Sequence, residues 1–247
     1  MVATGLFGRV DVAAELSALR RALTNYSVLE VARPAWDFDT HRSLLPSEQP
    51  GAPEPDGVWE TACRLIERYE FSAPQLVRAS YDPTEPLLGR NMLLQARFHG
   101  LHFYLGVRVT SVIDEARADG DRAWGWAYET LEGHLERGKA TYEVVKRAGS
   151  GQIEFVITSY SQRAPTLGPI TRLGWRLFGR RTQLRFYRDC GRRLHLLVEA
   201  SRLGRPPRHA PATADGLVLA PSDARTYGLD RIALHRAHPG RLPTWQA

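Results

Sequence analysis

Strand-like apolar runs follow one another closely in the middle of the chain and predict a β-sheet. Turn-rich pieces such as residues 118–121 and 149–151 separate some of these runs. Such short connections favour antiparallel pairing, because a parallel pair needs a crossover of about a dozen residues or more. No helical pattern alternates with the runs, which argues against a Rossmann-type sheet. The predicted strands are residues 76–81, 91–98, 101–113, 123–131, 140–146 and 152–161.

Apolar residues recur every three or four positions in three further segments and predict helices over residues 11–23, 58–69 and 169–201. Asp11 and Asp56 precede the first two helices, where a carboxylate can accept a hydrogen bond from a free amide of the first turn. In the third helix a basic stripe lies opposite an apolar one. The apolar stripe is Leu173, Leu177, Leu184, Tyr187, Cys190, Leu194 and Val198, and the basic stripe is Arg181, Arg185, Arg188 and Arg192.

The other segments are predicted from shorter signals. Residues 26–31 read as a short strand, and residues 34–57, rich in proline, serine and acidic side chains, as a loop. The segment beyond Gly204 contains the run RPPRHAPATADG and is expected to be flexible. We therefore divide the chain into an N-terminal helical extension (1–24), one α+β domain (25–200) and a basic C-terminal tail (201–247).

Composition narrows the class of protein. The 247 residues carry a net charge of +6, with the positive charge concentrated in the last third of the chain. No apolar run approaches the roughly 18 residues that a membrane-spanning helix needs. The first residues lack the basic stretch and apolar segment of a secretory signal, so a cytoplasmic location is expected. Two cysteines, Cys63 and Cys190, are too few for a disulfide framework or a thiolate metal cage.

These elements together predict a strongly curved antiparallel sheet wrapped around one long amphipathic C-terminal helix, which is a helix-grip architecture of the α+β class. We expect the curvature to prevent side chains from filling the interior completely. An elongated apolar space would then lie between sheet and helix and suit a small hydrophobic ligand. A fold does not determine a function, so the functional hypotheses rest on particular side chains.

Residues 125–138, GWAYETLEGHLERG, resemble the signature F-G-F-A-Y-G-T-L-P-G-H-x-E-x-G-E of the DUF1990 family. Glu129 and Glu132 replace a glycine and a proline of that signature, and Lys139 replaces its last acidic residue. The G-H-x-E-x-G hairpin is the most specific part of the resemblance.

Further matches extend the resemblance over roughly residues 25–200. Residues 89–90 and 107–115 stand where the family has G-R and R-I-V-Y-V-x-D-E, and residues 159–161 stand where it has A-F-S-R-P, a run that Gln162 and Arg163 disturb. The resemblance implies a relative of the START/Bet v 1-like superfamily, in agreement with the helix-grip order. It brings no established activity with it.

His134 and Glu136 are the candidates for acid–base chemistry. They are two residues apart, so on an extended segment their side chains would share a face. A carboxylate near an imidazole raises the imidazole pKa, and the two groups could exchange a proton with a substrate. Gly133 and Gly138 equally suit a structural turn whose polar groups bind the backbone. Both interpretations stay open.

Polar and aromatic side chains on three predicted strands are the candidates for ligand binding. The aromatic face of the strand over residues 123–131 would form an apolar wall ending in a hydroxyl, or simply belong to the core. Arg108 would meet a carboxylate or an anionic ligand if it is buried, and water if its face is exposed. Tyr160, on one face with Thr158, could direct a hydroxyl into the cavity. The candidates are Tyr104, Arg108, Trp124, Trp126, Tyr128, Thr130 and Tyr160.

Other kinds of site lack a signature. His99 and His102 lie on a strand-turn-strand segment rather than on a helix, and Ser161 and Cys63 have no G-x-S-x-G context. We therefore expect no metal and no cofactor. The arginine stripe lacks interleaved aromatic residues, and no nucleic-acid-binding motif is present. We expect neither a nucleic acid nor a membrane surface as partner.

Three functional hypotheses remain. In the first, the protein binds a small apolar molecule between sheet and helix, with Trp126 and Tyr128 lining the space and with Arg108, Tyr160 and His134 supplying polar contacts. In the second, the same space belongs to an enzyme, a cyclase or a hydrolase, with His134 and Glu136 as acid–base pair. In the third, the arginine-rich helix and tail bind an acidic partner. Neither the ligand nor the oligomeric state follows from the sequence.

Overall fold

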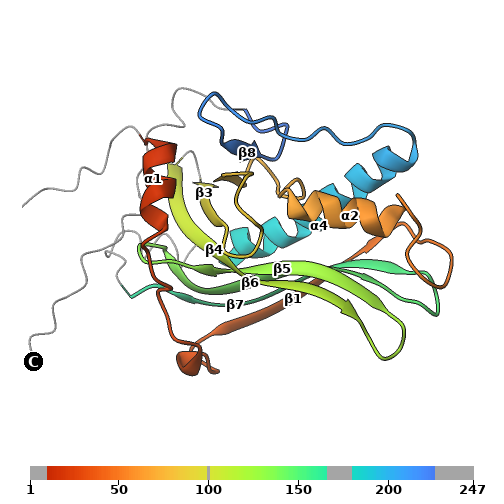
Figure 1. Ribbon diagram of the computed structural model, residues 1–247. Coiled ribbons are helices and arrows are strands. Elements are labelled where there is room, and N and C mark those ends of the chain that lie inside the picture. The colour runs from red at the N-terminus through yellow and green to blue at the C-terminus, as the bar shows by residue number, and fades with distance from the viewer. Residues whose placement is uncertain (1–9, 99–100, 166–179, 226–247) are drawn as a thin grey trace, which may run out of the picture.

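A single curved antiparallel sheet organises the chain in the computed structural model, which describes residues 10–98, 101–165 and 180–225. The sheet curls around two helices, α2 (Val58–Glu67) and α4 (Arg180–Arg202), as Figure 1 shows. This is the helix-grip architecture that the sequence predicts. The strand order is β1-β7-β6-β5-β4-β3-β2-β8. The strands are β1 (Asp37–Leu45), β2 (Val77–Tyr81), β3 (Asn91–Phe98), β4 (Leu101–Ala116), β5 (Arg122–Thr130), β6 (Glu136–Lys146), β7 (Ile153–Arg163) and β8 (Val218–Ala220).

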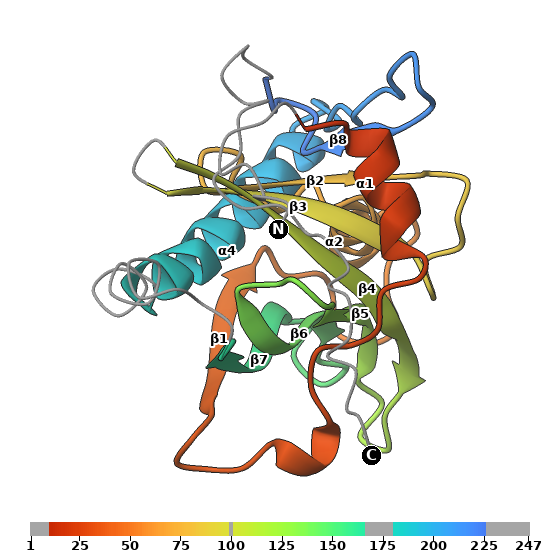
Figure 2. The same cartoon turned by 90° about the vertical axis from the view of Figure 1, so that its left-hand side faces the viewer.

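Strand register assigns each side chain to the concave face, toward α2 and α4, or to the convex face. Trp126 pairs with Tyr142 across β5 and β6, and Tyr142 pairs with Ile157 across β6 and β7. These three side chains are fully buried beneath the helices. Because side chains alternate along a strand, their neighbours at odd separations face outward. Figure 2 shows α4 lying between β1 and the β2–β8 edge of the same sheet.

Large aromatic side chains fill the concave space beneath α2. The indole Nε1 of Trp126 donates a hydrogen bond to the Ile66 carbonyl oxygen at 3.0 Å and ties the sheet to the end of this helix. Ring centroids within the cluster lie between 4.6 and 6.4 Å apart, which is the range of favourable aromatic contact. The expected apolar space is therefore closed in this half of the interior. The cluster comprises Tyr69, Phe71, Trp126, Tyr142 and Phe155.

A buried ion pair joins the start of α2 to the sheet. Lys146 Nζ lies 2.6 Å from Glu48 Oε2, and both side chains are at most 1% exposed. Glu48 also accepts the amide hydrogen of Trp59 at 2.7 Å and thereby caps α2. Burial raises the pKa of Glu48, but the bonds from Lys146 and the Trp59 and Glu54 amides outweigh it and lower the pKa overall. The predicted Asp56 cap is wrong, since Asp56 pairs with Arg64 instead.

The N-terminal helix covers the convex face, not the concave one. Helix α1 (Val12–Leu19) is capped by Asp11, which accepts the Ala14 amide hydrogen at 3.0 Å as predicted. It ends four residues earlier than the periodicity suggests. Leu19 packs on Gly106 of β4 so closely that a Cβ there would lie 2.3 Å from the leucine Cδ2. A larger residue at this position would force the Leu19 side chain to shift.

Two local predictions before α2 are wrong. Residues 26–31 contain a short 3-10 helix (Val28–Glu30) rather than a strand. Strand β1 occupies part of the predicted loop over residues 34–57 and pairs with β7 along its whole length. Its inward positions include the polar residues Asp39, His41 and Ser43, whereas Phe38 and Leu44 face outward and are exposed. This inverted alternation hides the strand from a hydrophobicity pattern.

The segment after α4 belongs to the same sheet over its described part. Strand β8 pairs with β2, which the sequence analysis did not predict for the tail. The Glu70 carboxylate accepts amide hydrogens from Ala210 at 3.1 Å and Ser222 at 2.8 Å, and Arg193 forms an ion pair with Asp223 at 2.8 Å. These contacts hold residues 205–225 against the helices. The predicted start of the long helix, residues 169–179, lies outside the described residues.

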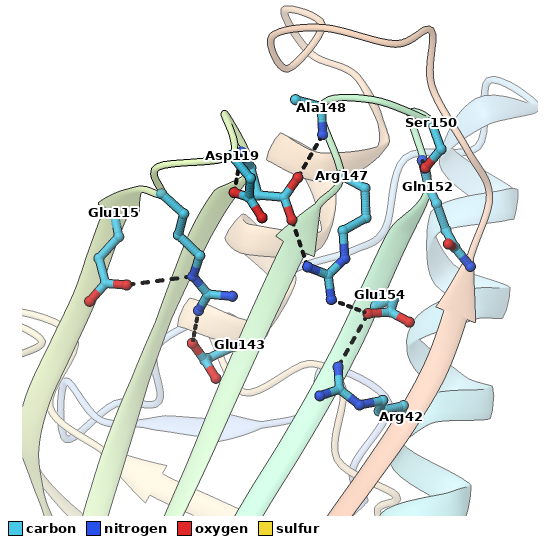
Figure 3. Close-up of polar contacts among 11 residues, drawn as sticks. Arg42, Glu115, Asp119, Glu143, Arg147, Ala148, Ser150, Gln152 and Glu154 are labelled. Carbon is cyan, nitrogen blue, oxygen red and sulfur yellow. Dashed lines mark hydrogen bonds and ion pairs between the residues drawn. The ribbon is translucent and has the colours of Figure 1, made fainter.

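Ion pairs connect neighbouring strands on the convex face near the hairpins (Figure 3). Arg147 lies 2.6 Å from Asp121 and 3.1 Å from Glu154, and Glu154 also accepts a hydrogen bond from Arg42 of β1. Arg117 forms a separate pair with Glu143 at 3.1 Å. Partly exposed pairs of this kind contribute little individually, but here they lock adjacent strands in register at one end of the sheet.

Replacing Lys146 by methionine would leave Glu48 buried without its partner. We expect Lys146→Met to lower the free energy of unfolding by about 3–5 kcal/mol at neutral pH. The pKa of Glu48 is lowered in the folded state, so the contribution of the pair is present above the ordinary carboxyl pKa and is lost as the pH falls below it. Urea titrations at several pH values measure both effects.

Lys139→Met is the matched control, because Lys139 lies on the convex face of the same strand. Its loss should stay within about 0.5 kcal/mol. The double variant Glu48→Gln/Lys146→Met should be more stable than Lys146→Met alone. Equal stabilities of the two lysine variants would show that the pair does not hold α2 to the sheet.

Candidate functional site

The concave face changes character from the middle of the sheet toward the first turns of α4. Four neighbouring positions on β6 and β7 carry small side chains, in the cross-strand pairs Gly138–Ser161 and Ala140–Ser159. Beyond them, the inward positions are polar. The residues at this end are Asp37 and Asp39 on β1, Glu136 on β6, Ser159, Ser161 and Arg163 on β7, and Arg180, Gln183 and Tyr187 on α4.

A hydrogen-bonded network anchors the start of α4 to the two strands at this edge of the sheet. Arg180 forms a bidentate ion pair with Asp39 of β1. Gln183 donates a hydrogen bond to the Ser161 hydroxyl at 3.2 Å, and the Tyr187 and Ser159 hydroxyl oxygens lie 2.8 Å apart. The network fixes the helix over the small side chains of β6 and β7. The Arg180 charge is balanced by Asp39 within it.

The Glu136 side chain lies beside this network but forms no hydrogen bond with it. No side chain in the described segments donates a hydrogen bond to its carboxylate, although its backbone forms several. Burial, reinforced by the negative charge of Asp37, raises the pKa of Glu136 to about 7, and Arg180 opposes this shift only in part. A carboxyl group in this state exists in both protonation forms near neutral pH. It can therefore donate or accept a hydrogen bond or a proton.

His134 and Glu136 do not form the acid–base pair that their spacing suggests. Nδ1 of His134 accepts the backbone amide hydrogen of Glu136 at 2.9 Å, so the imidazole closes the hairpin. The Glu136 carboxylate lies instead among Asp37, Asp39 and Arg180 on the concave face. His134 is 6% exposed. The His134 imidazole therefore binds the backbone of the turn, as the structural interpretation requires. The Glu136 carboxylate forms no hydrogen bond with it.

The aromatic face of β5 points toward the helices, as both interpretations require. Trp126 belongs to the filled aromatic cluster, and Trp124 packs against the same core. The hydroxyl of Tyr128 accepts a hydrogen bond from Tyr142 at 3.2 Å, and burial raises the Tyr128 pKa to about 12. Thr130 bonds to Asn25 and Gly138 and so secures the hairpin. Tyr128 pairs with Ala140 of β6, on the same face as Glu136.

Three other candidates lie on the convex face. Tyr104 packs against α1. Arg108 donates hydrogen bonds to the Leu19 carbonyl at 2.6 Å and to Asn91 at 2.9 Å, so it binds the end of α1 rather than a carboxylate, a ligand or water. The Tyr160 hydroxyl lies 3.0 Å from that of Tyr26 and belongs to the cluster that holds the N-terminal segment. None of them faces the concave interior.

The alternation of apolar residues along the strand already indicates that Tyr160 lies on the convex face. In β7 the fully buried residues Ile153, Phe155 and Ile157 mark the inward positions, and Tyr160 is out of phase with them. Asp39 and Arg180 were missed for other reasons. The first lies on the strand with inverted alternation, and the second belongs to neither the apolar nor the basic stripe of the predicted helix.

A depression lies near the end of α4 that is remote from Glu136, and it is less suited to a ligand site. It has a volume of about 460 Å³ and lies between the loop after β1, the start of α2 and the end of α4. Its carboxylates Glu48, Glu54 and Asp56 all have partners within the protein. Within the described ranges, no group of three or more metal-ligating side chains comes together. No helix among the described residues is long and apolar enough to cross a membrane.

The raised pKa of Glu136 predicts how the stability of the protein changes with pH. Its folded-state pKa of about 7 exceeds the ordinary value of 4.5, so its contribution to stability is present below about pH 4.5 and is lost as the pH rises through 7. We expect Glu136→Gln to be more stable than the wild type at pH 8, by on the order of 1–3 kcal/mol, and similar to it at pH 4. Urea unfolding at both pH values measures the difference.

Glu143→Gln provides the comparison, because Glu143 lies on the same strand but faces outward. It should show no gain at pH 8. A Glu136→Gln protein whose stability follows the wild type at every pH would contradict the raised pKa of Glu136.

Several solved structures resemble this chain. Among solved structures, the chain is similar to a protein of Thermus thermophilus (12% identity, TM-score 0.43, 67% of this chain and 99% of that one). It is also similar to the Zhui aromatase/cyclase of Streptomyces sp. R1128, with 13% identity, a TM-score of 0.40, and coverage of 67% of this chain and 98% of that one. A third similar structure is the ginseng major latex-like protein 151 of Panax ginseng, with 10% identity, a TM-score of 0.39, and coverage of 66% of this chain and 97% of that one. None of the curated protein sequences matches it.

The family comparison covers most of the described domain. The model of DUF1990, a domain of unknown function, matches residues 24–193, from the segment before β1 into the middle of α4. The match includes the hairpin with His134 and Glu136 and the small-residue positions of β6 and β7. Since it spans more than half of the chain, the protein belongs to the DUF1990 family.

Proposed function

We propose that the protein binds a small amphipathic molecule on the concave face of the sheet, between β6, β7 and the first turns of α4. The observation that carries this proposal is the half-buried Glu136 carboxyl group, which lies on the concave face of β6 and receives no side-chain hydrogen bond from the described residues. A buried polar group without a partner is costly. A bound ligand that supplies the missing hydrogen bond would remove that cost.

The neighbouring side chains suit the apolar part of such a molecule. Gly138, Ala140 and Ser159 are small, buried residues on the concave face at this point, in contrast to the bulky cluster beneath α2. Tyr128 and Tyr187 flank these positions with aromatic surface. A few polar groups in a mainly apolar setting are typical of small-molecule sites. The wall of the proposed site thus shifts from Trp126 to Tyr128, and its polar contact shifts from Arg108, Tyr160 and His134 to Glu136.

A neutral fluorescent probe, N-phenyl-1-naphthylamine, tests this location. We expect binding in the micromolar range, with amide chemical shifts changing for residues 138–140 and 159–161. Ala140→Phe, which places a bulky ring among these small residues, should weaken binding at least about tenfold, equivalent to 1.4 kcal/mol. Thr141→Phe, on the convex face of the same strand, should bind like the wild type.

Circular dichroism and thermal unfolding establish that both phenylalanine variants are folded. Should the wild type fail to bind the probe, or should shifts appear only on the convex face, the proposed location is wrong. Equal binding by the two variants would have the same meaning.

The exposed arginine stripe of α4 supports a second candidate function, which is binding of an acidic partner. All four arginines of the stripe are exposed, as predicted. Of these four, and among the described residues, only Arg185 has an acidic partner, which is Asp189 at 3.5 Å. Unpaired like charges on one helix face attract an oppositely charged surface.

A charge-reversed protein separates this candidate from the first. In Arg181→Glu/Arg188→Glu/Arg192→Glu, affinity for a fluorescently labelled decaglutamate peptide at low salt should fall by about tenfold or more, as measured by anisotropy. Binding of the neutral probe should not change, because the stripe faces away from the sheet. If decaglutamate binds both proteins alike, the stripe is only a solvated helix face.

A further inference from the structure

A single row of side chains runs along the outward face of α4 and continues the arginine stripe into the turn that follows the helix. Members of the row follow one another at spacings of four and three residues, which keep them on one side of the helix. The first four are basic, and the later ones include two leucines. This outer row of α4 consists of Arg181, Arg185, Arg188, Arg192, Leu196, Glu199 and Leu203.

Arginines of α4 that lie against the rest of the protein have acidic partners there. Arg193, for example, pairs with Asp223 at 2.8 Å and donates a hydrogen bond to the Glu70 carbonyl oxygen at 2.7 Å. In the outer row, among the described residues, only Arg185 has an acidic partner, and this is Asp189 on the same helix. The described part of the protein therefore leaves most of the positive charge of the row unbalanced.

The remaining segments of the chain contain too few acidic side chains to neutralise the outer row. Residues 1–9, 99–100, 166–179 and 226–247 include one acidic residue, which is Asp230. The basic residues of the same segments outnumber it, and they are Arg9, Arg172, Arg176, Arg231, Arg236 and Arg241. The negative charge that complements the row therefore has to come from another molecule.

The second half of the outer row exposes large apolar side chains. Leu196 is 58% exposed and Leu203 is 66% exposed. Leu203 directly follows α4, and its amide donates a hydrogen bond to the Glu199 carbonyl oxygen at 3.1 Å, so the helical turn continues to this residue. Because the two leucines are seven residues apart, they lie on the same side of the helix. A partner with apolar side chains would gain free energy by covering them.

We propose that the outer row of α4 binds an acidic α-helix of a partner protein, whose carboxylates face the four arginines and whose apolar side chains face Leu196 and Leu203. This inference rests on the second candidate function, binding of an acidic partner, and adds the kind of partner. The row extends over about 33 Å, at 1.5 Å for each residue of a helix. A second helix presents its side chains at the same spacings of three and four residues, so charged and apolar groups can meet along the whole row.

Other anionic partners fit the outer row less well. A polynucleotide offers phosphates to the arginines, but its bases would stack on aromatic side chains, which the row lacks. An anionic membrane surface is broad and would also cover the carboxylates of Asp189 and Glu199, which it repels. A single helix is narrow enough to contact the arginines and the leucines without covering Asp189.

Two labelled helical peptides, compared by fluorescence anisotropy, test the proposal. Both carry glutamates at the spacing of the four arginines, and at the spacing of Leu196 and Leu203 one carries leucines and the other alanines. A second pair with the leucines or alanines placed before the glutamates covers the opposite direction of the partner helix. In one of the two pairs, we expect the leucine peptide to bind the wild type at least about tenfold more tightly than the alanine peptide.

Leu196→Ala/Leu203→Ala should remove this advantage and leave the affinity for the alanine peptide unchanged. Alanine keeps the helix intact, which circular dichroism verifies. The charge-reversed protein should bind both peptides at least about tenfold more weakly than the wild type does. Leu29→Ala/Leu88→Ala, which truncates exposed leucines elsewhere on the surface, is the matched control and should behave like the wild type.

The outcomes separate this inference from the candidate function on which it rests. Equal affinity for the leucine and alanine peptides in both pairs would overturn the helical partner and leave binding of an acidic partner standing, as would binding of decaglutamate alone. If neither the helical peptides nor decaglutamate bind, both proposals fall together. Tighter binding to phosphatidylglycerol vesicles than to any peptide, lost in Leu196→Ala/Leu203→Ala, would show that the row contacts a membrane surface and would also overturn the helical partner.

Discussion

The register between β6 and β7 is the constraint on which the candidate site depends. It pairs Gly138 with Ser161 and Ala140 with Ser159, and it directs Glu136 toward α4 and Tyr160 toward the N-terminal segment. Because the side-chain period of a strand is two, a slip by one residue would exchange these roles along the whole strand. The convex ion pairs of Arg147 and the paired length of β1 oppose such a slip.

The concave interior has two parts with different physical tasks. Beneath α2, the aromatic cluster around Trp126 and Tyr142 fills the space and provides stability, and the Glu48–Lys146 pair fixes the helix above it. Toward the start of α4, small side chains and the half-buried Glu136 carboxyl group take the place of the aromatic rings. A domain can keep an unsatisfied, destabilising group such as Glu136 because its core lies elsewhere. Strained or costly groups of this kind concentrate at functional sites.

The sequence was informative wherever apolar residues mark the inward face. Six strands, α2 and the exposed arginine stripe were predicted for that reason, and together they define the helix-grip fold. It failed for β1, whose inward residues are polar, and for β8, which is only three residues long. The motif identified Glu136 as a candidate, but it did not show that the Glu136 and His134 side chains point in different directions. A spacing of two shows that His134 and Glu136 are close, yet it does not show that the imidazole turns to the backbone.

The most direct test is whether ionisation of Glu136 changes the NMR signals of tyrosine rings on the concave face and leaves those on the convex face unchanged. Fluorine NMR of protein labelled with 3-fluorotyrosine, assigned by Tyr→Phe variants, measures this at each ring. We predict that the Tyr128 and Tyr187 signals shift with a midpoint near pH 7 and that both shifts vanish in Glu136→Gln, while Tyr104 stays unchanged. Titration of Tyr104 with that midpoint, or silence of Tyr128 and Tyr187, would contradict the placement of Glu136.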